Sequence, residues 1–285
     1  MGAIFGTAGV PEEFYEQKYK AAIQAPGFLE RYGLDAYEYQ CGRGVNISES
    51  GAEALGKKAR EHNITLSIHS PYFISLSSLV EETRLKSVDY ILQCAKMAKA
   101  MGAKRIVVHS GSCGKISRED ALTLASDTIK KAQDALDQNG YTDISICPET
   151  MGKINQLGNV EEVIALCKID ERIIPAIDFG HLNARTLGGI KNIEDYATIL
   201  DRFETELGVY RTSIFHSHFS KIEYSTGGEK CHLTFDDSVF GPDFEPLMEL
   251  IYKRNYSPII ICESAGTQAK DALIMKKYYN TLIKP

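Results

Sequence analysis

Six short apolar runs in the sequence end on a histidine, a carboxylate or both: LSIHSPY, IVVHSGS, ISICPET, IPAIDFGH, SIFHSHF and IIICES. Interpreted as β-strands, these runs bring the following residues to one edge of a sheet: His69, His109, Glu149, Asp178, His181, His216, His218 and Glu263. Imidazole and carboxylate groups in this ratio are typical ligands of zinc, manganese or iron. Because one ion cannot use so many ligands, we predict a multinuclear metal centre.

The histidines gather at predicted strand ends. Of the seven in the chain, five lie at a strand end or within three residues of one, and a sixth, His232, falls in a long segment after the seventh strand. Only His62 ends a predicted helix, where solvent or the helix dipole is the expected contact. A single histidine at a strand end is more often structural than a ligand, but repetition over successive strands favours a metal site. His216 and His218 share one strand face, so one of them could be a ligand and the other a supporting or substrate contact.

The elements that must position these residues follow a regular alternation. We predict strands near residues 3–7, 36–40, 66–70, 105–110, 144–149, 174–178, 212–218 and 259–263, with helices between them, for example over 48–63, 81–102 and 117–140. The last helix begins with a cap at Ser117 and stops at Gly140. Such alternation forms right-handed parallel βαβ units. Eight units predict a single (β/α)8 TIM barrel over residues 1–285, with its chemistry at the C-terminal rim of the strands. The longest irregular insertion runs from Ser220 to about Phe244.

Composition indicates which partners and which cellular compartment to expect. The net charge of −6 argues against a polyanionic partner such as nucleic acid. The argument is weak, because two or three bound divalent cations would make the electrostatic field at the site more positive. Seven cysteines without a CxxC pair indicate a reducing compartment, and Cys147 and Cys262 are expected in the core. The longest apolar runs are shorter than a membrane span of about 18 residues, and a secretory leader is not seen. We therefore expect a cytoplasmic protein that has no membrane contact.

A series of motifs runs through nearly the whole chain: GTAG, IHSPYFISLSS, VVHSG, PET, DFGH, HSHFSK and ESAG. In this order and at these spacings they resemble endonuclease IV, the metal-dependent apurinic/apyrimidinic endonuclease of DNA base-excision repair, and more closely its divergent archaeal and bacterial branch. The resemblance implies two or three ions, of zinc or of zinc with manganese, and Fe²⁺ is an alternative ion. The implied ligands are His69, His109 and Glu149 for the first ion, Glu149, Asp178, His216 and Glu263 for the second, and His181 with His232 for the third.

The sequence departs from this family after the seventh predicted strand. Better-known members offer an Asp-x-His pair to the third ion, whereas this chain reads Gly228-Glu229-Lys230-Cys231-His232. A charged Lys230 cannot ligate, so either Glu229 reaches the ion, or His218 joins His181 and His232, or the third site is weak. His218 also stands where the common pattern has a polar amide.

The resemblance further implies hydrolysis of the phosphodiester 5′ to an abasic site, which leaves a 3′-hydroxyl. Two bridged metals would generate the nucleophile and hold the phosphate, with Glu149 or Glu263 orienting the attacking water, and a third cation would stabilise the leaving oxygen. The expected partner is double-stranded DNA with an abasic site, and the enzyme is expected to be a monomer. Family members insert rim-loop residues into the duplex. The candidates for DNA contact here are Arg43, Tyr72, Phe73, Arg185 and Lys221.

Two other functions stay open. A sugar isomerase or epimerase of the xylose-isomerase-like superfamily would need only one or two ions, for which Glu149, Asp178, His216 and Glu263 suffice. The additional histidines at 69, 109 and 181 argue against that alternative. A metal-free binding barrel is the other alternative. Three ions per chain would support the endonuclease, one the isomerase and none the binding protein.

Overall fold

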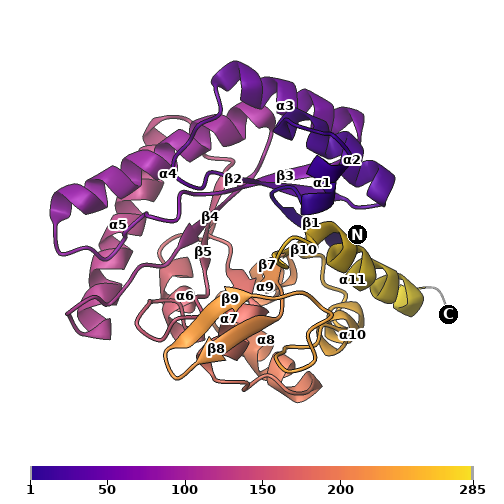
Figure 1. Cartoon of the computed structure of the whole chain (residues 1–285). Helices are drawn as coiled ribbons and strands as arrows, with labels where there is room; N and C mark the ends of the chain where they lie inside the picture. Colours follow the sequence, from indigo (N-terminus) through magenta and orange to yellow (C-terminus); the bar gives the residue numbers. More distant parts are fainter. Residues whose placement is uncertain (1, 284–285) are drawn as a thin grey trace.

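In the computed structural model, which describes residues 2–283, eight parallel strands close into a barrel (Figure 1). The strand order around the barrel is β1 (Ile4–Ala8), β2 (Ala36–Gln40), β3 (Thr65–His69), β4 (Arg105–His109), β5 (Ser145–Glu149), β6 (Ala176–Asp178), β7 (His216–Phe219) and β10 (Ile259–Cys262). Pairing of β10 with β1 closes the ring. The predicted (β/α)8 TIM barrel is thereby confirmed.

Helices lie around the outside of the barrel (Figure 1). The longer ones are α2 (Ala25–Tyr32), α3 (Glu49–Glu61), α4 (Glu81–Met101), α5 (Arg118–Gln138), α6 (Val160–Cys167), α7 (Phe179–Arg185), α8 (Ile193–Leu207), α10 (Glu245–Lys253) and α11 (Gln268–Ile283). Three short turns complete the set: α1 (Glu12–Glu16), η1 (Ala22–Gln24) and α9 (Val209–Ser213). As predicted, Ser117 caps α5 by accepting the backbone N–H of Asp120 at 3.0 Å. Within residues 2–283, none of the helices is both long and apolar enough to cross a bilayer.

Most apolar side chains pack in the layer between strands and helices. A separate, small apolar cluster is formed by Val107, Cys147 and Ala176 of β4, β5 and β6. Cys147 and Cys262 are fully buried, as predicted, and all seven cysteines are free thiols. Parallel strands covered on both faces read as continuous apolar runs, which explains why these strands were visible in the sequence.

Two predicted elements differ from the structure. The strand predicted at 212–218 begins only at His216, because residues up to Ser213 form the helical turn α9. The segment predicted to be irregular after Ser220 contains an antiparallel hairpin, β8 (Ile222–Ser225) and β9 (Gly228–His232), drawn in orange in Figure 1. The sequence did contain a signal for this hairpin, since Gly227 lies in its two-residue turn, Thr226-Gly227, and glycine favours such turns. His62, predicted to face solvent or the helix dipole, ends α3 and contacts Glu30 at 2.7 Å.

Candidate metal centre

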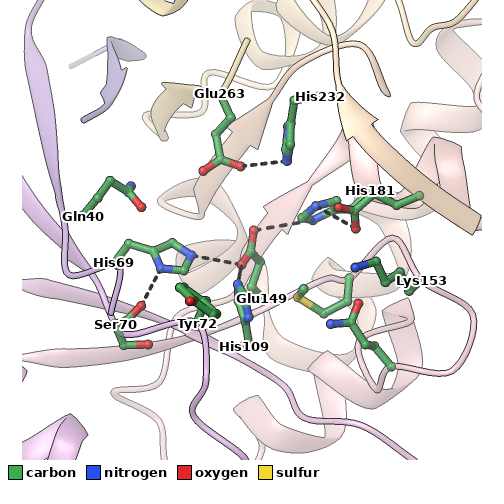
Figure 2. Close-up of a pocket in the computed structure, with 14 residues that line it drawn as sticks. Gln40, His69, Ser70, Tyr72, His109, Glu149, Lys153, His181, His232 and Glu263 are labelled. Atoms are coloured by element: carbon green, nitrogen blue, oxygen red, sulfur yellow. Dashed lines mark hydrogen bonds and ion pairs between the residues drawn. The ribbon is translucent and has the colours of Figure 1, made fainter. Parts of the chain in front are cut away.

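Polar side chains from several strand ends meet in a cleft of about 350 Å³ at the C-terminal rim of the barrel (Figure 2). The ligand-type residues that line it are His69, His109, Glu149, His181, Glu229, His232 and Glu263. Asp178 and His218 lie directly beneath and are fully buried. The structure therefore gathers the predicted ligands from β3, β4, β5, β6, β7 and β10 at one place, together with two residues of the hairpin.

Glu149, at the end of β5, lies in the middle of this group (Figure 2). Its Oε2 atom is 3.5 Å from Nε2 of both His69 and His109, and its Oε1 atom is 2.7 Å from Nδ1 of His218. Burial opposes ionisation, but the charge and hydrogen bond of His218 outweigh it and hold the pKa of Glu149 well below its usual value. Glu149 is therefore an anion placed between several imidazoles.

A second group joins Glu149 to Asp178, His218 and Glu263, whose donor atoms lie within 4.8 Å of one another. Asp178 accepts the backbone N–H of His181 at 2.8 Å through Oδ1 and so caps α7. Burial raises the pKa of Asp178 and of Glu263, and neighbouring carboxylates add to the shift. Three carboxylates crowded in a buried space require compensating positive charge.

His216 lies apart from this group. It is fully buried at the start of β7, where its Nε2 atom is 2.9 Å from Oε2 of Glu38. The two histidines do share the inward face of the strand, as predicted, but each residue advances about 3.3 Å along a parallel strand. His218 therefore stands about 6.6 Å nearer to the rim. The structure brings His218 to Glu149, Asp178 and Glu263, and it does not bring His216 there.

A third group combines His181, Glu229 and His232. Nε2 of His181 is 3.4 Å from Oε2 of Glu229, and Lys230 instead pairs with Glu223. The backbone N–H of Glu229 donates to the carbonyl of Gly152 at 3.2 Å, which fixes β9 against the loop after β5. Of the alternatives left open by the sequence, the structure brings Glu229 to His181 and keeps His218 in the second group.

Gly152 makes this approach sterically possible. A Cβ atom at this position would lie 2.6 Å from Cβ of Glu229 and 3.0 Å from Cδ2 of His181. Any larger residue would push the carboxylate away from the imidazole. Gly152 was missed at the sequence level, because a glycine after a strand gives no indication of what it faces.

Several of the imidazoles are oriented by a hydrogen bond at the ring nitrogen that faces away from the cleft. Nδ1 of His69 donates to the carbonyl of Ser70 at 2.8 Å, and Nδ1 of His181 donates to the carbonyl of Thr150 at 3.0 Å. Nδ1 of His232 hydrogen-bonds with the hydroxyl of Ser220 at 2.8 Å. In each case Nε2 is left to face the cleft, which is the usual arrangement of metal-binding histidines.

The pKa values of these imidazoles depend on their partners. Burial disfavours charge on both His69 and His181, but neighbouring carboxylates, chiefly Glu149 for the first and Asp178 for the second, raise the pKa of each to about 9. Burial lowers the pKa of His109 to about 3. Because a ligating imidazole must be neutral, metal binding to His69 and His181 at neutral pH would release protons.

The residues present fit divalent transition metals. Oε2 of Glu149 and Oδ2 of Asp178 are buried and have no hydrogen-bond partner among residues 2–283. Such atoms are costly unless a cation or water satisfies them. Mixed imidazole and carboxylate donors suit zinc, manganese or iron better than magnesium or calcium, which prefer oxygen ligands alone.

The loops after β2 and β3 present the exposed candidates for DNA contact. Tyr72 and Phe73 are 53% and 42% exposed, and their ring centroids lie 6.0 Å apart. Tyr72 also lines the cleft, and its backbone N–H donates to the carbonyl of Gly42, next to the exposed Arg43. These two loops therefore form one edge of the cleft.

Arg185 and Lys221 have other partners in the structure. The guanidinium of Arg185 donates to backbone carbonyls in the loop after β5, namely those of Met151, Lys153, Ile154 and Gln156. Nζ of Lys221 donates to the carbonyl of Asp237 at 2.6 Å, and the side chain is only 13% exposed. The side chains of Arg185 and Lys221 therefore hydrogen-bond to backbone carbonyls of rim loops and are not free to contact DNA in this structure.

Sequence comparison places the chain among known barrels. The profile of the xylose isomerase-like TIM barrel family matches residues 27–278. An uncharacterized protein of Methanocaldococcus jannaschii is 33% identical over 279 residues, covering 98% of this chain and 97% of its own. A protein named probable endonuclease 4 from Aster yellows witches'-broom phytoplasma is 26% identical and covers 79% of this chain and 78% of its own.

Solved structures agree with this placement. Endonuclease IV from Thermus thermophilus superposes with a TM-score of 0.68 at 16% identity, covering 92% of this chain and 95% of its own. A D-tagatose 3-epimerase-like protein superposes with a TM-score of 0.70 at 20% identity, covering 88% and 90%. At these identities the structural likeness concerns the fold alone. From the profile match and the relatives together, the chain belongs to the xylose isomerase-like TIM barrel family, and its relatives include endonuclease 4 proteins.

Proposed function

We propose that this protein is a metal-dependent phosphodiester hydrolase that cleaves double-stranded DNA 5′ to an abasic site and leaves a 3′-hydroxyl. The observation that most supports this proposal is the convergence of three ligand groups around one cleft, with Glu149 shared between the first two. A mononuclear enzyme needs only one such group. The endonuclease 4 relatives favour the same activity.

The proposed ligand sets follow the geometry. The first ion would be held by His69, His109 and Glu149, since Nε2 of each histidine lies 3.5 Å from Oε2 of Glu149. The second would be held by Glu149, Asp178, His218 and Glu263, and the third by His181, Glu229 and His232. Donor atoms of His218 also lie within 4.8 Å of those of His69 and Glu149, so His218 stands next to both of the first two sites. His218 thus takes the place predicted for His216 from the sequence. Zinc is the proposed metal, with Mn²⁺ or Fe²⁺ as alternatives. Bound ions of this kind supply Lewis-acid catalysis and an activated water for phosphodiester hydrolysis.

Protein groups would orient the attacking water and the substrate. Glu263 borders the cleft beside Glu149, and either carboxylate would orient the attacking water. A cleft of about 350 Å³ suits one abasic sugar and its phosphate, provided that the nucleotide leaves the duplex. Tyr72 and Phe73 would then stack on the bases beside the gap, and Arg43 would contact a phosphate. We propose that the protein acts as a monomer.

A cleavage assay tests this proposal. Zinc-loaded protein is incubated with a 5′-labelled duplex that carries one tetrahydrofuran abasic analogue, and the products are separated on a denaturing gel. We expect one nick 5′ to the analogue, with a 3′ end that a DNA polymerase extends, and an intact control duplex without the analogue. An uncut substrate, with protein that carries three ions per chain, would contradict the proposal.

One observation favours a second candidate. Glu149, Asp178, His218 and Glu263 alone would hold a single ion, as in a metal-dependent sugar epimerase, and an epimerase-like protein shares the fold. That function leaves the group of His181, Glu229 and His232 without a role. Epimerisation of a ketose by protein carrying one ion per chain would favour it over the endonuclease.

A further inference from the structure

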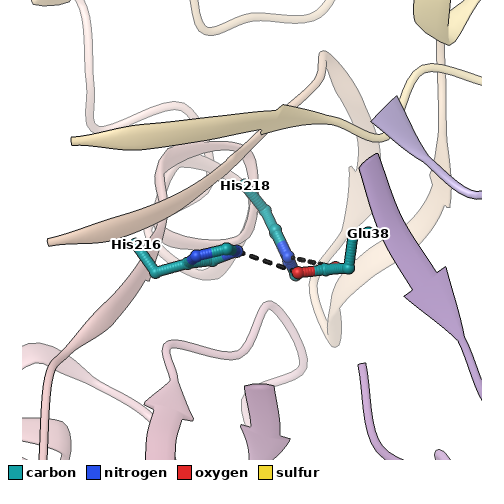
Figure 3. Close-up of side chains that lie close together, drawn as sticks. All are labelled: Glu38, His216 and His218. Carbon is teal, nitrogen blue, oxygen red and sulfur yellow. Dashed lines mark hydrogen bonds and ion pairs between the residues drawn. The ribbon is translucent and has the colours of Figure 1, made fainter. Parts of the chain in front are cut away.

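Glu38 occupies an unexpected position in the middle of β2. It points into the barrel, is fully buried, and lies between His216 and His218 (Figure 3). Its carboxylate accepts hydrogen bonds from the Ser67 hydroxyl at 2.9 Å and from the Gln40 amide at 3.1 Å. Glu38 is not among the ligands predicted from the sequence, although an acidic residue inside a strand of a buried barrel is itself unusual.

His218 differs from the other hydrogen-bonded histidines in the ring nitrogen that contacts its supporting group. His69, His181 and His232 are each held through Nδ1 by a carbonyl or hydroxyl group. His218 is held through Nε2, which lies 2.9 Å from Oε1 of Glu38. Because an ionised carboxylate can only accept, Nε2 must carry the hydrogen of this bond. Nδ1 lies 2.7 Å from Oε1 of Glu149 and 3.5 Å from Oε2 of Glu263. Because Glu149 is also ionised, Nδ1 carries a hydrogen too when no ion is bound, and a metal shared with Glu149 would take the place of that hydrogen.

We propose that Glu38 is a positioning residue, which keeps the hydrogen of His218 on Nε2 and directs Nδ1 toward the ion shared with Glu149, Asp178 and Glu263. The inference rests on the metal centre proposed above. Ser67 and Gln40 fix Glu38 in turn, so a chain of contacts runs from β2 and β3 to the ligand on β7. A carboxylate behind a metal-binding imidazole orients the ring and makes it a stronger ligand.

The same residues do not make a convincing fourth metal site. Donor atoms of Glu38, His216 and His218 do lie within 4.8 Å of one another. However, the Glu38 oxygens already accept three hydrogen bonds, from Ser67, Gln40 and His218. A metal bound to Nε2 of His218 would also displace the hydrogen of that ring while Nδ1 faces a second ion. We therefore expect three ions per chain and none beside Glu38.

Two substitutions at Glu38 test the proposal. In Glu38→Gln the side-chain amide oxygen can still accept from Nε2–H of His218, whereas Glu38→Ala removes the acceptor. We expect Glu38→Ala to weaken zinc binding at the second site by roughly 10–100-fold and Glu38→Gln by less than about tenfold. Chelator competition measures these affinities. Asp271→Asn, which changes another buried carboxylate in α11, should leave them unaltered.

Nuclear magnetic resonance provides a readout that a general loss of stability would not mimic. In zinc-loaded protein labelled with ¹⁵N-histidine, we expect an exchange-protected Nε2–H signal that disappears in His218→Asn and in Glu38→Ala but persists in Glu38→Gln. If Glu38→Ala fails to fold, the wild type and Glu38→Gln still decide the question. Zinc bound through Nε2 of His218 would overturn the proposal, and so would equal affinities in all Glu38 variants.

Metal counting separates the two proposals. Four ions on the wild type and three on Glu38→Ala would show a metal site at Glu38 and overturn the positioning role. Three ions on both proteins with unchanged affinity would overturn this inference alone. A wild type that binds no zinc would overturn the proposed metal centre and this inference with it.

Discussion

The candidate metal centre has two parts that are attached to the barrel in different ways. We call six residues the strand-end ligands, because each lies at or next to the end of a barrel strand: His69, His109, Glu149, Asp178, His218 and Glu263. The hairpin ligands, Glu229 and His232, come from β9, which is not part of the barrel. The remaining ligand, His181, lies in the first turn of α7, directly after β6. Each strand that carries a strand-end ligand pairs with two neighbouring strands. The hairpin instead packs on α7 and is bonded to the loop after β5 and to the Ser220 hydroxyl.

This difference predicts which ions the centre holds most tightly. Backbone in a closed barrel cannot shift at one strand without disturbing its neighbours, so the first two ligand groups are rigid. The hairpin lies outside the barrel and is joined to the loop after β5 by the bridge between Lys153 and Gly228 and by the bond from Glu229 to Gly152. We therefore expect the third ion to be the weakest, and the following variants test the contrast.

The largest effect is expected at the shared carboxylate. Glu149→Gln keeps the shape of the side chain but removes the charge between the first two ligand groups. We expect cleavage of the abasic duplex to fall by roughly three orders of magnitude or more, because each bridged ion contributes several kcal/mol. Circular dichroism should show an unchanged fold. The control is Glu223→Gln on the outer side of the hairpin; more than about a tenth of wild-type cleavage in Glu149→Gln would disprove the assignment.

A smaller effect is expected at the hairpin. Glu229→Ala should remove the third ion, leave two, and slow cleavage by roughly 10²–10³-fold, since one cation that stabilises a leaving oxygen contributes several kcal/mol. Metal analysis together with single-turnover kinetics measures both effects. The matched control is its neighbour Lys230→Ala, whose side chain pairs with Glu223. His218→Ala should instead remove the second ion. If Glu229→Ala keeps three ions, the hairpin does not hold the third ion.

The contact between loop and hairpin can be tested without changing a ligand. Gly152→Ala places a methyl group 2.6 Å from Cβ of Glu229, so the hairpin must shift. We expect the affinity for the third ion to fall by about tenfold or more while the first two ions stay tight. Gly227→Ala is the control, because its methyl group would meet only Ser225, at 3.8 Å. Unchanged affinity in Gly152→Ala would mean that the hairpin position does not depend on this contact.

The smallest effect concerns DNA and leaves both parts of the centre intact. Tyr72→Ala should weaken binding to an abasic duplex by about 1–3 kcal/mol, the usual contribution of an aromatic ring stacked on a base. Bound metal should be unchanged, because Tyr72 is exposed at the edge of the cleft. Fluorescence anisotropy and metal analysis measure the two properties. A loss of metal would show instead that Tyr72 supports the ligands.

The barrel was largely predictable because its strands are buried on both faces. The runs IVV and IIIC are apolar throughout and are followed directly by His109 and Glu263, so both the strand and its rim end can be located. The beginning of β7 could not be located, because a single helical turn, α9, has no periodicity of its own. The hairpin was not predicted, although Gly227 in its two-residue turn Thr226-Gly227 favours one.

The site was predictable in residue type but not in every role. Sequence alone puts His216 and His218 on one face, yet only the start of β7 decides which of them reaches the rim. The partners of Arg185 are backbone carbonyls about thirty residues earlier in the chain, which no local pattern reveals. Glu38 lies 180 residues from His218 in sequence and is brought to it only by closure of the barrel.

A count of metal ions during graded chelation tests the central contrast most directly. Native mass spectrometry of the zinc-loaded protein, at increasing chelator concentration and constant pH, reports how many ions each chain keeps. We predict three ions at the start, early loss of one, and a stable form with two, with the early loss already complete in Glu229→Ala. A single ion throughout, or three ions that leave together, would contradict a rigid pair at the strand ends and a weaker third site on the hairpin.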